Sequence, residues 1–140
     1  MNKRVFVDSD IILDLLGKRE PFYRFAAELC TLADTGEVEL VTTSLVIANV
    51  YYLLRKAKGN DRARELLRKL RMLIGVVPVT EHTVDLALNS HFSDFEDGLQ
   101  YYTALECGIP ILLTRNVRDY TEKGLVIQTA EEYLKGMNSV

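Results

Sequence analysis

The chain has 140 residues, 48% of them hydrophobic, and carries 17 Lys and Arg residues against 20 Asp and Glu residues, a net charge of −3. This length suits one domain with a substantial core, and no Pro-, Gly- or Ser-rich linker divides it, so we expect a single domain over residues 1–140. The apolar run Val5–Val7 behind the basic start is too short for a signal peptide or a membrane span. We therefore expect a cytoplasmic protein with no membrane segment.

The spacing of apolar residues predicts strands that alternate with helices. In chain order, the expected elements are a strand at 5–8, helices at 11–16 and 22–35, a strand at 38–42, helices at 45–56 and 61–72, a strand at 76–79, helices at 81–89 and 94–107, strands at 111–114 and 125–128, and a helix at 130–134. Thr43 or Ser44 is expected to cap the third of these helices, and Asp61 the fourth.

This alternation predicts an α/β fold. Strands that alternate with helices form a parallel sheet that helices cover on both faces. Ligands of such sheets lie beyond the carboxyl ends of the strands. Asp8 follows the first expected strand and Thr114–Asp119 follows the fourth, so we expect both segments at that edge of the sheet.

Acidic residues gather in three places, each near a short apolar run. The three groups are Asp8 and Asp10 in VFVDSD, Asp94, Glu96 and Asp97 in SDFED, and Asp119 at the end of ILLTRNVRD. Two carboxylates about 4 Å apart at an effective dielectric near 20 repel by roughly 4 kcal/mol, so such a cluster needs a metal ion, protons or a Lys or Arg side chain. Oxygen ligands of this kind suit Mg²⁺ or Mn²⁺. Taken singly, each acid has a second role open to it, as a helix cap or a turn residue.

Basic residues are concentrated between Arg55 and Arg71. This segment holds eight Lys or Arg residues and two acidic ones, a net charge of +6, so the rest of the chain carries −9. A basic patch on an otherwise acidic protein suits a polyanion that is held beside an acidic centre. The alternative is a solvated helix face with no ligand.

Four segments in this order resemble the successive motifs of PIN-domain proteins, the fold of VapC-type toxin ribonucleases. They are VFVDSDIILDLL, TTSLVIANVYYLL, DFEDGLQYYTALECG and LLTRNVRDY, and they extend from Val5 to Tyr120. The resemblance implies a three-layer α/β/α sandwich around a parallel sheet of about five strands, commonly ordered 3-2-1-4-5. It also implies a ribonuclease that depends on a divalent metal, Mg²⁺ or Mn²⁺, and that cleaves RNA phosphodiester bonds.

The resemblance also implies roles for individual residues. Asp8 matches the central metal ligand, Asp97 the acid at the start of a helix, and 116–119 the last acidic position. The expected catalytic residues are Asp8, Asp97 and Asp119, and the expected metal ligands are Asp8, Asn49, Asp94, Asp97, Asn116 and Asp119. Substrate or ligand orientation is expected from Ser9, Ser44 and Thr114, and RNA binding from Arg62, Lys69 and Arg71.

Two positions depart from the family pattern. Asn49 stands where the family usually has Glu, and Asn116 where it often has Asp. An Asn carbonyl oxygen can bind Mg²⁺, but each exchange removes a full charge, which the other acids of the same motifs would have to supply. A degenerate PIN domain that binds RNA or protein without cutting is therefore an alternative, as is a pure interaction module.

A third class of protein also places an Asp after the first strand of a parallel sheet. These are the haloacid-type phosphatases and receiver domains, for which Asp8 would be the nucleophile and Lys123 the basic partner. The basic segment and the order of the motifs fit that class poorly. For the PIN reading we expect an RNA substrate, an antitoxin protein as partner, and a homodimer.

Overall fold

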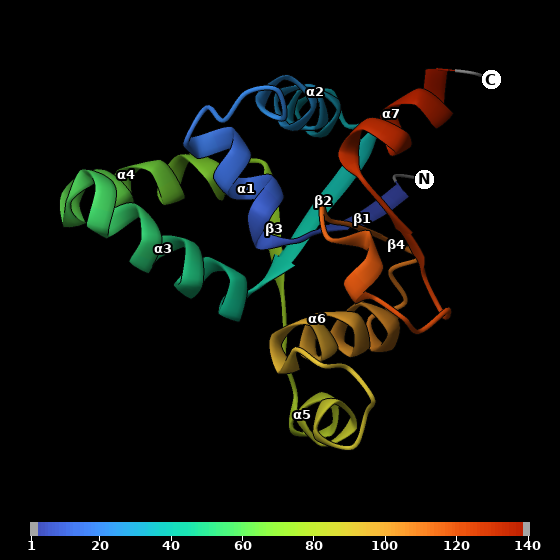
Figure 1. Cartoon of the computed structure of the whole chain (residues 1–140). Coiled ribbons are helices and arrows are strands. Elements are labelled where there is room, and N and C mark those ends of the chain that lie inside the picture. The colour runs from blue at the N-terminus through green and yellow to red at the C-terminus, as the bar shows by residue number, and fades with distance from the viewer. Residues whose placement is uncertain (1–2, 139–140) are drawn as a thin grey trace.

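The structure is a computed structural model that describes residues 3–138, and Figure 1 shows its arrangement. Five parallel strands form one sheet in the order β3-β2-β1-β4-β5. They are β1 (Lys3–Val7), β2 (Val38–Thr43), β3 (Ile74–Val77), β4 (Ile111–Leu113) and β5 (Val126–Gln128). Both the number of strands and the predicted strand order are confirmed.

Helices cover both faces of this sheet, which makes three layers (Figure 1). On one face lie α5 and α6, and on the other lie α1, α2, α3, α4 and α7. The bounds are α1 Ser9–Leu16, α2 Tyr23–Asp34, α3 Ser44–Lys58, α4 Asn60–Leu70, α5 Glu81–Leu88, α6 Phe95–Glu106 and α7 Ala130–Asn138, with a 3₁₀ turn, η1, at Val117–Asp119. The α/β/α sandwich is therefore confirmed.

Strand β1 shows why the chain folds this way. Val5 and Val7 point to the layer of α1, α2, α3 and α7, whereas Phe6 points to α6 on the opposite face. All three side chains are almost fully buried. A strand that is covered on both faces needs apolar residues at every position rather than at alternate ones, and the run VFV meets that need.

Several boundaries differ from the predictions by a few residues. β3 begins at Ile74, two residues before the expected start, where Ile74 pairs with Leu40. α4 begins at Asn60 with Gly59 as the N-cap, so the prediction that Asp61 caps this helix is wrong, and Asp61 lies in the first turn. α7 continues to Asn138, beyond the expected end at Leu134, and Met137 in this added turn packs against the core. Thr43 caps α3 through a bond from the Val46 N–H, which settles the choice between Thr43 and Ser44.

The carboxyl ends of β1 and β4 lie side by side. The Asp8 N–H donates to the Leu113 carbonyl at 3.0 Å, and the Thr114 N–H donates to the Gln128 carbonyl at 2.9 Å. This ladder brings the residue after β1 next to the residue after β4, as predicted for this edge of the sheet. Among residues 3–138, every helix is too short or too polar to cross a bilayer.

Candidate active site

Asp8 is the most tightly held polar side chain at this edge. It is 4% exposed and caps α1 by accepting from the Ser9 N–H at 2.7 Å. Its Oδ1 also accepts from Gln100 Nε2 at 3.0 Å, and its Oδ2 accepts from the Thr114 and Tyr120 hydroxyls at 3.0 and 3.1 Å. Helix capping and a place in the acidic cluster are thus combined in one residue. These donors fix both carboxylate oxygens in position.

Asp97 lies in the first turn of α6, opposite Asp8. Asp94 caps this helix through bonds from the Glu96 and Asp97 N–H groups at 2.8 and 3.2 Å. Burial, followed by the charges of Asp94, Asp8 and Asp119 in that order, raises the pKa of Asp97 from its ordinary 3.8 to about 7. The structure therefore brings these four acids into one electrostatic cluster.

Tyr120 links the two sides of the cluster. Its buried hydroxyl lies 3.1 Å from Asp8 Oδ2 and 3.4 Å from Asp97 Oδ1. Burial, followed by the charges of Asp8 and Asp97, raises the pKa of Tyr120 far above its ordinary value, so the phenol keeps its proton. The single hydroxyl proton of Tyr120 can bond to only one of these two carboxylates at a time. The negative charges of Asp8 and Asp97 are therefore not neutralised by it.

Asp10 adds a second unsatisfied carboxylate beside Asp8. Its Oδ2 accepts from the Arg115 N–H at 2.9 Å and from the Thr114 hydroxyl at 3.3 Å, and it lies 3.5 Å from Asn116 Nδ2. Its Oδ1 is buried and has no hydrogen-bond partner. Burial and then the charge of Asp8 raise the pKa of Asp10 to about 6.

Asn49 is joined to the start of α6. Its Nδ2 donates to Glu96 Oε2 at 3.0 Å, a contact between residues 47 apart in sequence. The amide on α3 therefore faces a carboxylate on α6 that belongs to the same acidic motif as Asp94 and Asp97. Glu96 thus places a negative charge next to the position where Asn49 has none.

These groups fit a hard divalent cation such as Mg²⁺ or Mn²⁺. The donors are oxygen atoms, two of the carboxyl groups have strongly raised pKa values, and Asp10 Oδ1 has no partner. Among residues 3–138, no three Asp, Glu, His or Cys side chains already converge as a complete set of ligands. A cation held here would therefore keep several of its waters, which is the usual state of protein-bound Mg²⁺.

The other expected residues have mixed positions. Thr114 is fully buried and its hydroxyl bonds to Asp8 and Asp10, so of its two expected roles the contacts support orientation of the carboxylates. Ser9 Oγ lies 3.5 Å from Asp8 Oδ1. Ser44 is exposed at the start of α3 and lines a groove with Tyr51 and Tyr52.

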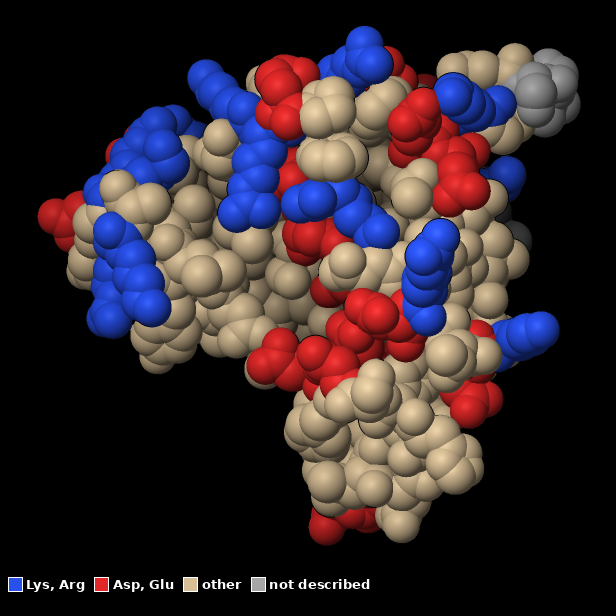
Figure 2. Space-filling model, viewed as in Figure 1, with Lys and Arg blue, Asp and Glu red and all other residues tan. Residues whose placement is uncertain are grey.

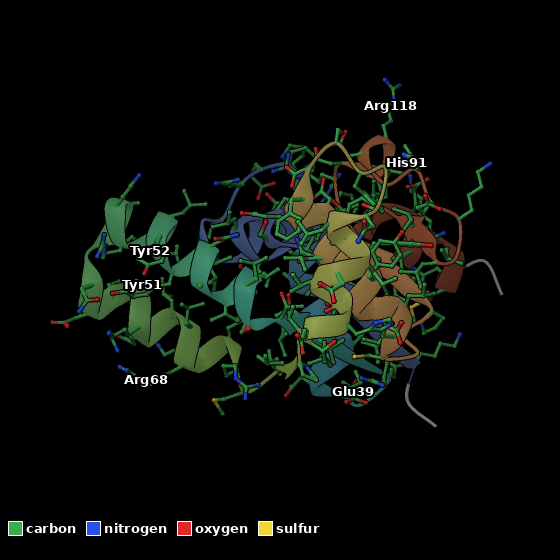
Figure 3. All side chains as sticks on the ribbon, turned by 90° about the horizontal axis from the view of Figure 1, so that it is seen from below. Glu39, Tyr51, Tyr52, Arg68, His91 and Arg118 are labelled. Carbon is green, nitrogen blue, oxygen red and sulfur yellow. The ribbon has the colours of Figure 1, made fainter. Side chains whose placement is uncertain are left out.

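The basic segment is not beside the acidic cluster. Figure 2 shows the acidic residues in the middle of one face, over the start of α6, and Lys and Arg residues over α4 at the side. In Figure 3, Arg68 of α4 and Arg118 of η1 lie at opposite ends of the molecule. On α4, Arg62 and Lys69 share an ion pair with Glu65 at 2.9 and 3.3 Å, and Arg71 Nη1 donates to the Ile74 carbonyl at 2.8 Å.

Known proteins that are similar to this chain point to one family. The family described as PIN domain matches residues 4–118. The chain belongs to the PIN-domain family. Ribonuclease VapC1 of Aquifex aeolicus (strain VF5) is 24% identical over 144 residues, which span 99% of this PIN domain and 99% of that protein.

Two solved structures share the fold of this PIN domain. A toxin–antitoxin complex from Klebsiella pneumoniae contains a chain with a TM-score of 0.65 at 18% identity, covering 87% of this chain and 95% of that one. VapC20 of Mycobacterium tuberculosis, described as a sarcin-ricin loop cleaving toxin, has a TM-score of 0.62 at 19% identity, covering 77% and 86%.

Four residues of this PIN domain belong to the site although the sequence analysis did not select them. Gln100 and Tyr120 hold Asp8, and Arg115 forms a two-point ion pair with the buried Asp14 at 2.9 and 3.1 Å. The available signals were weak: an acid one helical turn after Asp10 in an apolar helix, an amide one turn after Asp97, and an aromatic residue directly after Asp119.

Proposed function

We propose that this chain is a divalent-metal-dependent endoribonuclease that hydrolyses RNA phosphodiester bonds. The observation that carries the proposal is the pair formed by Asp8 and Asp97, two buried or half-buried carboxyl groups at the carboxyl end of a parallel sheet, with which no Lys or Arg among residues 3–138 forms an ion pair. The names of two similar proteins, a ribonuclease and a toxin that cleaves the sarcin-ricin loop, support RNA as the substrate.

Asp8 and Asp97 would hold Mg²⁺ or Mn²⁺, with Asp94, Asp119, Asn116 and Asn49 around them. When bound, the cation would lower the pKa of a coordinated water and offset charge on the phosphate. The chain contributes orientation: Gln100, Thr114 and Tyr120 keep the Asp8 oxygens in place. Asp119 is exposed beside Asp97, where it adds negative charge. The reaction needs no protein nucleophile.

We also propose that the chain is the toxin of a toxin–antitoxin pair. The likeness to a chain of the Klebsiella complex supports a small antitoxin as partner. We further propose a homodimer, a cytoplasmic location, and an RNA path on which Ser9, Ser44, Arg62, Lys69 and Arg71 contact the substrate. The competing function is a PIN domain that binds RNA without cutting it, which the exchange at Asn49 favours.

Cleavage of a structured RNA in Mn²⁺ separates these functions. We expect cleavage that EDTA abolishes, and a loss of at least about a hundredfold in Asp8→Asn, because roughly 3 kcal/mol of charge stabilisation corresponds to that factor. Asp34→Asn, on the exposed end of α2, is the matched control and should cleave like the parent. Unchanged cleavage in Asp8→Asn would remove Asp8 from the centre, and RNA binding without any cleavage would establish the competing function.

A further inference from the structure

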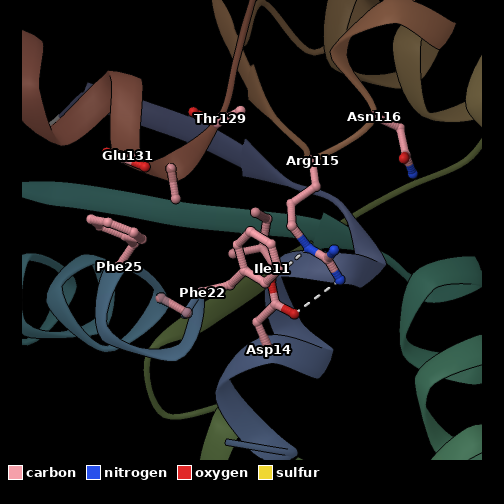
Figure 4. Close-up of a pocket in the computed structure, with 10 residues that line it drawn as sticks. Ile11, Asp14, Phe22, Phe25, Arg115, Asn116, Thr129 and Glu131 are labelled. Atoms are coloured by element: carbon pink, nitrogen blue, oxygen red, sulfur yellow. Dashed lines mark hydrogen bonds and ion pairs between the residues drawn. The ribbon is translucent and has the colours of Figure 1, made fainter. Parts of the chain in front are cut away.

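A cavity of about 240 Å³ opens between α1, α2 and α7, beside the acidic cluster but outside it. Its walls include Ile11 and Asp14 of α1, Phe22 and Phe25 at the start of α2, and Arg115 and Asn116 after β4. Figure 4 shows Phe25 and Glu131 on one side, Arg115 on the other, and Phe22 between them. The pocket therefore combines two aromatic rings with a guanidinium group and polar side chains.

The side chain of Arg115, in the wall of the cavity, is held in one orientation by its neighbours. Its guanidinium forms two bonds with Asp14, which is 1% exposed, and lies over the Phe22 ring at 4.2 Å from the ring centre. A guanidinium whose charge is already matched by a buried carboxylate is a poor clamp for phosphate. It is instead a flat, oriented surface beside an aromatic ring. Asp14 and Glu131 in the same walls also disfavour an anion.

The size of the cavity indicates what it can hold. Pockets for drug-sized ligands have volumes of about 300–1,000 Å³, so a cavity of this size suits one flat ring system. Arg115 covers one face of the Phe22 ring, but Phe22 is still 38% exposed, which leaves part of the ring open for stacking. The Asn116 Nδ2, which lies 3.5 Å from Asp10 Oδ2, has a second N–H that can donate to the edge of such a ring.

The cavity is continuous with the proposed metal centre. Asn116 lines the cavity and its Nδ2 lies 3.5 Å from Asp10 Oδ2, while the backbone N–H of Arg115 donates to that same oxygen. Asp10 in turn shares the Thr114 hydroxyl with Asp8. Asn116 would therefore lie between a ring held in the cavity and the carboxylate of Asp10.

We propose that this cavity binds a single nucleobase of the RNA substrate by stacking on Phe22 and fixes which phosphodiester lies over the acidic cluster. The proposal rests on the proposed function, because it assumes that RNA is the substrate. The cavity is then a specificity site, and the residues that decide which base is accepted are Asn116 and Arg115.

The test uses a short single-stranded RNA that carries 2-aminopurine, titrated into the full chain in EDTA so that binding is read without cleavage. We expect quenching of the 2-aminopurine at one position of the RNA. Phe22→Ala should abolish that quenching and weaken binding at least about fivefold, the lower end of the loss of one base–aromatic stack. The matched control is Leu88→Ala, which removes an exposed apolar side chain of α5, on the other face of the sheet from the cavity, and should bind within about twofold of the parent.

The proposal is overturned if the two variants bind the RNA equally well, or if the 2-aminopurine is quenched at no position. The cavity would then be a candidate site for a protein partner. Mn²⁺ calorimetry on Phe22→Ala should give the parent affinity, which separates the cavity from the metal centre. Should Phe22→Ala fail to fold, the ring resonances of Phe22 and Phe25 in the parent must shift when the RNA is added, and unmoved resonances overturn the proposal. The nuclease proposal fails independently, when the parent does not cleave RNA in Mn²⁺.

Discussion

Asn49, which stands where PIN-domain proteins usually have Glu, forms a hydrogen bond with a carboxylate on another helix. Its amide donates to Glu96, so the negative charge near this corner stands on α6 rather than on α3. A carboxylate at position 49 would face Glu96 with no donor between the two groups. The pair explains why the amide is tolerated: the side chain at 49 must be neutral unless a cation or a proton lies next to Glu96.

Asn49→Glu should therefore change the stability of the metal-free protein and of the metal-bound protein differently. We expect the metal-free variant to lose about 1 kcal/mol of stability, which is roughly 3–5 °C in the melting temperature for a chain of this size. We expect Mn²⁺ to restore that loss, so the metal-induced shift becomes larger than in the parent. Differential scanning calorimetry with EDTA and with Mn²⁺ measures both quantities.

The control for this substitution is Asn49→Glu combined with Glu96→Gln. This double variant exchanges the charge between the two helices, so its metal-free melting temperature should return to that of the parent. An Asn49→Glu protein whose metal-induced shift equals that of the parent would show that position 49 lies outside the metal centre.

The raised pKa values of Asp97 and Asp10 make stability depend on pH. With folded pKa values of about 7 and about 6, against an ordinary value of 3.8, the folded state holds protons that the unfolded state has lost between pH 4 and 7. The free energy of unfolding in EDTA should therefore fall as the pH rises from 5 to 8. Urea titrations at several pH values measure it, and Asp97→Asn should flatten the curve. Stability that rises over this interval contradicts the assignment.

At the scale of elements, α4 and α6 carry opposite charges and lie on opposite faces of the sheet (Figure 1). Among the basic residues of α4, Arg62 and Lys69 each form an exposed ion pair with Glu65. Exposed pairs of this kind contribute little to stability, so α4 can release these side chains to a ligand at small cost. Only an RNA long enough to span both helices would contact them while a phosphate lies over the cluster.

Replacement of Arg62, Lys69 and Arg71 by Gln should therefore act on long RNA and spare short RNA. For a long single strand, the slope of log K against log salt should become shallower by up to about 2, since each lost phosphate contact accounts for about 0.7. Fluorescence anisotropy at several salt concentrations measures the slope for both lengths. Lys3→Gln, at the amino end of β1, is the control. An unchanged slope with long RNA would return α4 to the role of a solvated surface.

At the scale of the whole molecule, the order of the sheet and the edge where the acids meet were both predictable. Periodicity located the strands, whereas their order was expected only from the resemblance to PIN-domain proteins. Boundaries were less accurate: the basic helix and β3 shifted because Gly59 and Ile74, rather than Asp61 and Val76, mark their starts.

The partners of each carboxylate were not predictable. Asp8 receives its bonds from Gln100, Thr114 and Tyr120, at sequence separations of 92, 106 and 112 residues. Local patterns report which face of an element a residue lies on, but pairing across such separations is decided by how the layers pack. The ion pair of Arg115 with Asp14 was missed for the same reason.

The middle position of β1 in the sheet also has a consequence for protein synthesis. As the chain leaves the ribosome, β1 pairs first with β2, and its other edge stays open until β4 emerges. A nascent chain that stops short of Tyr120 has Asp8 but lacks one of the donors that hold it. The set of donors that holds Asp8 is therefore complete only after Tyr120 has been translated.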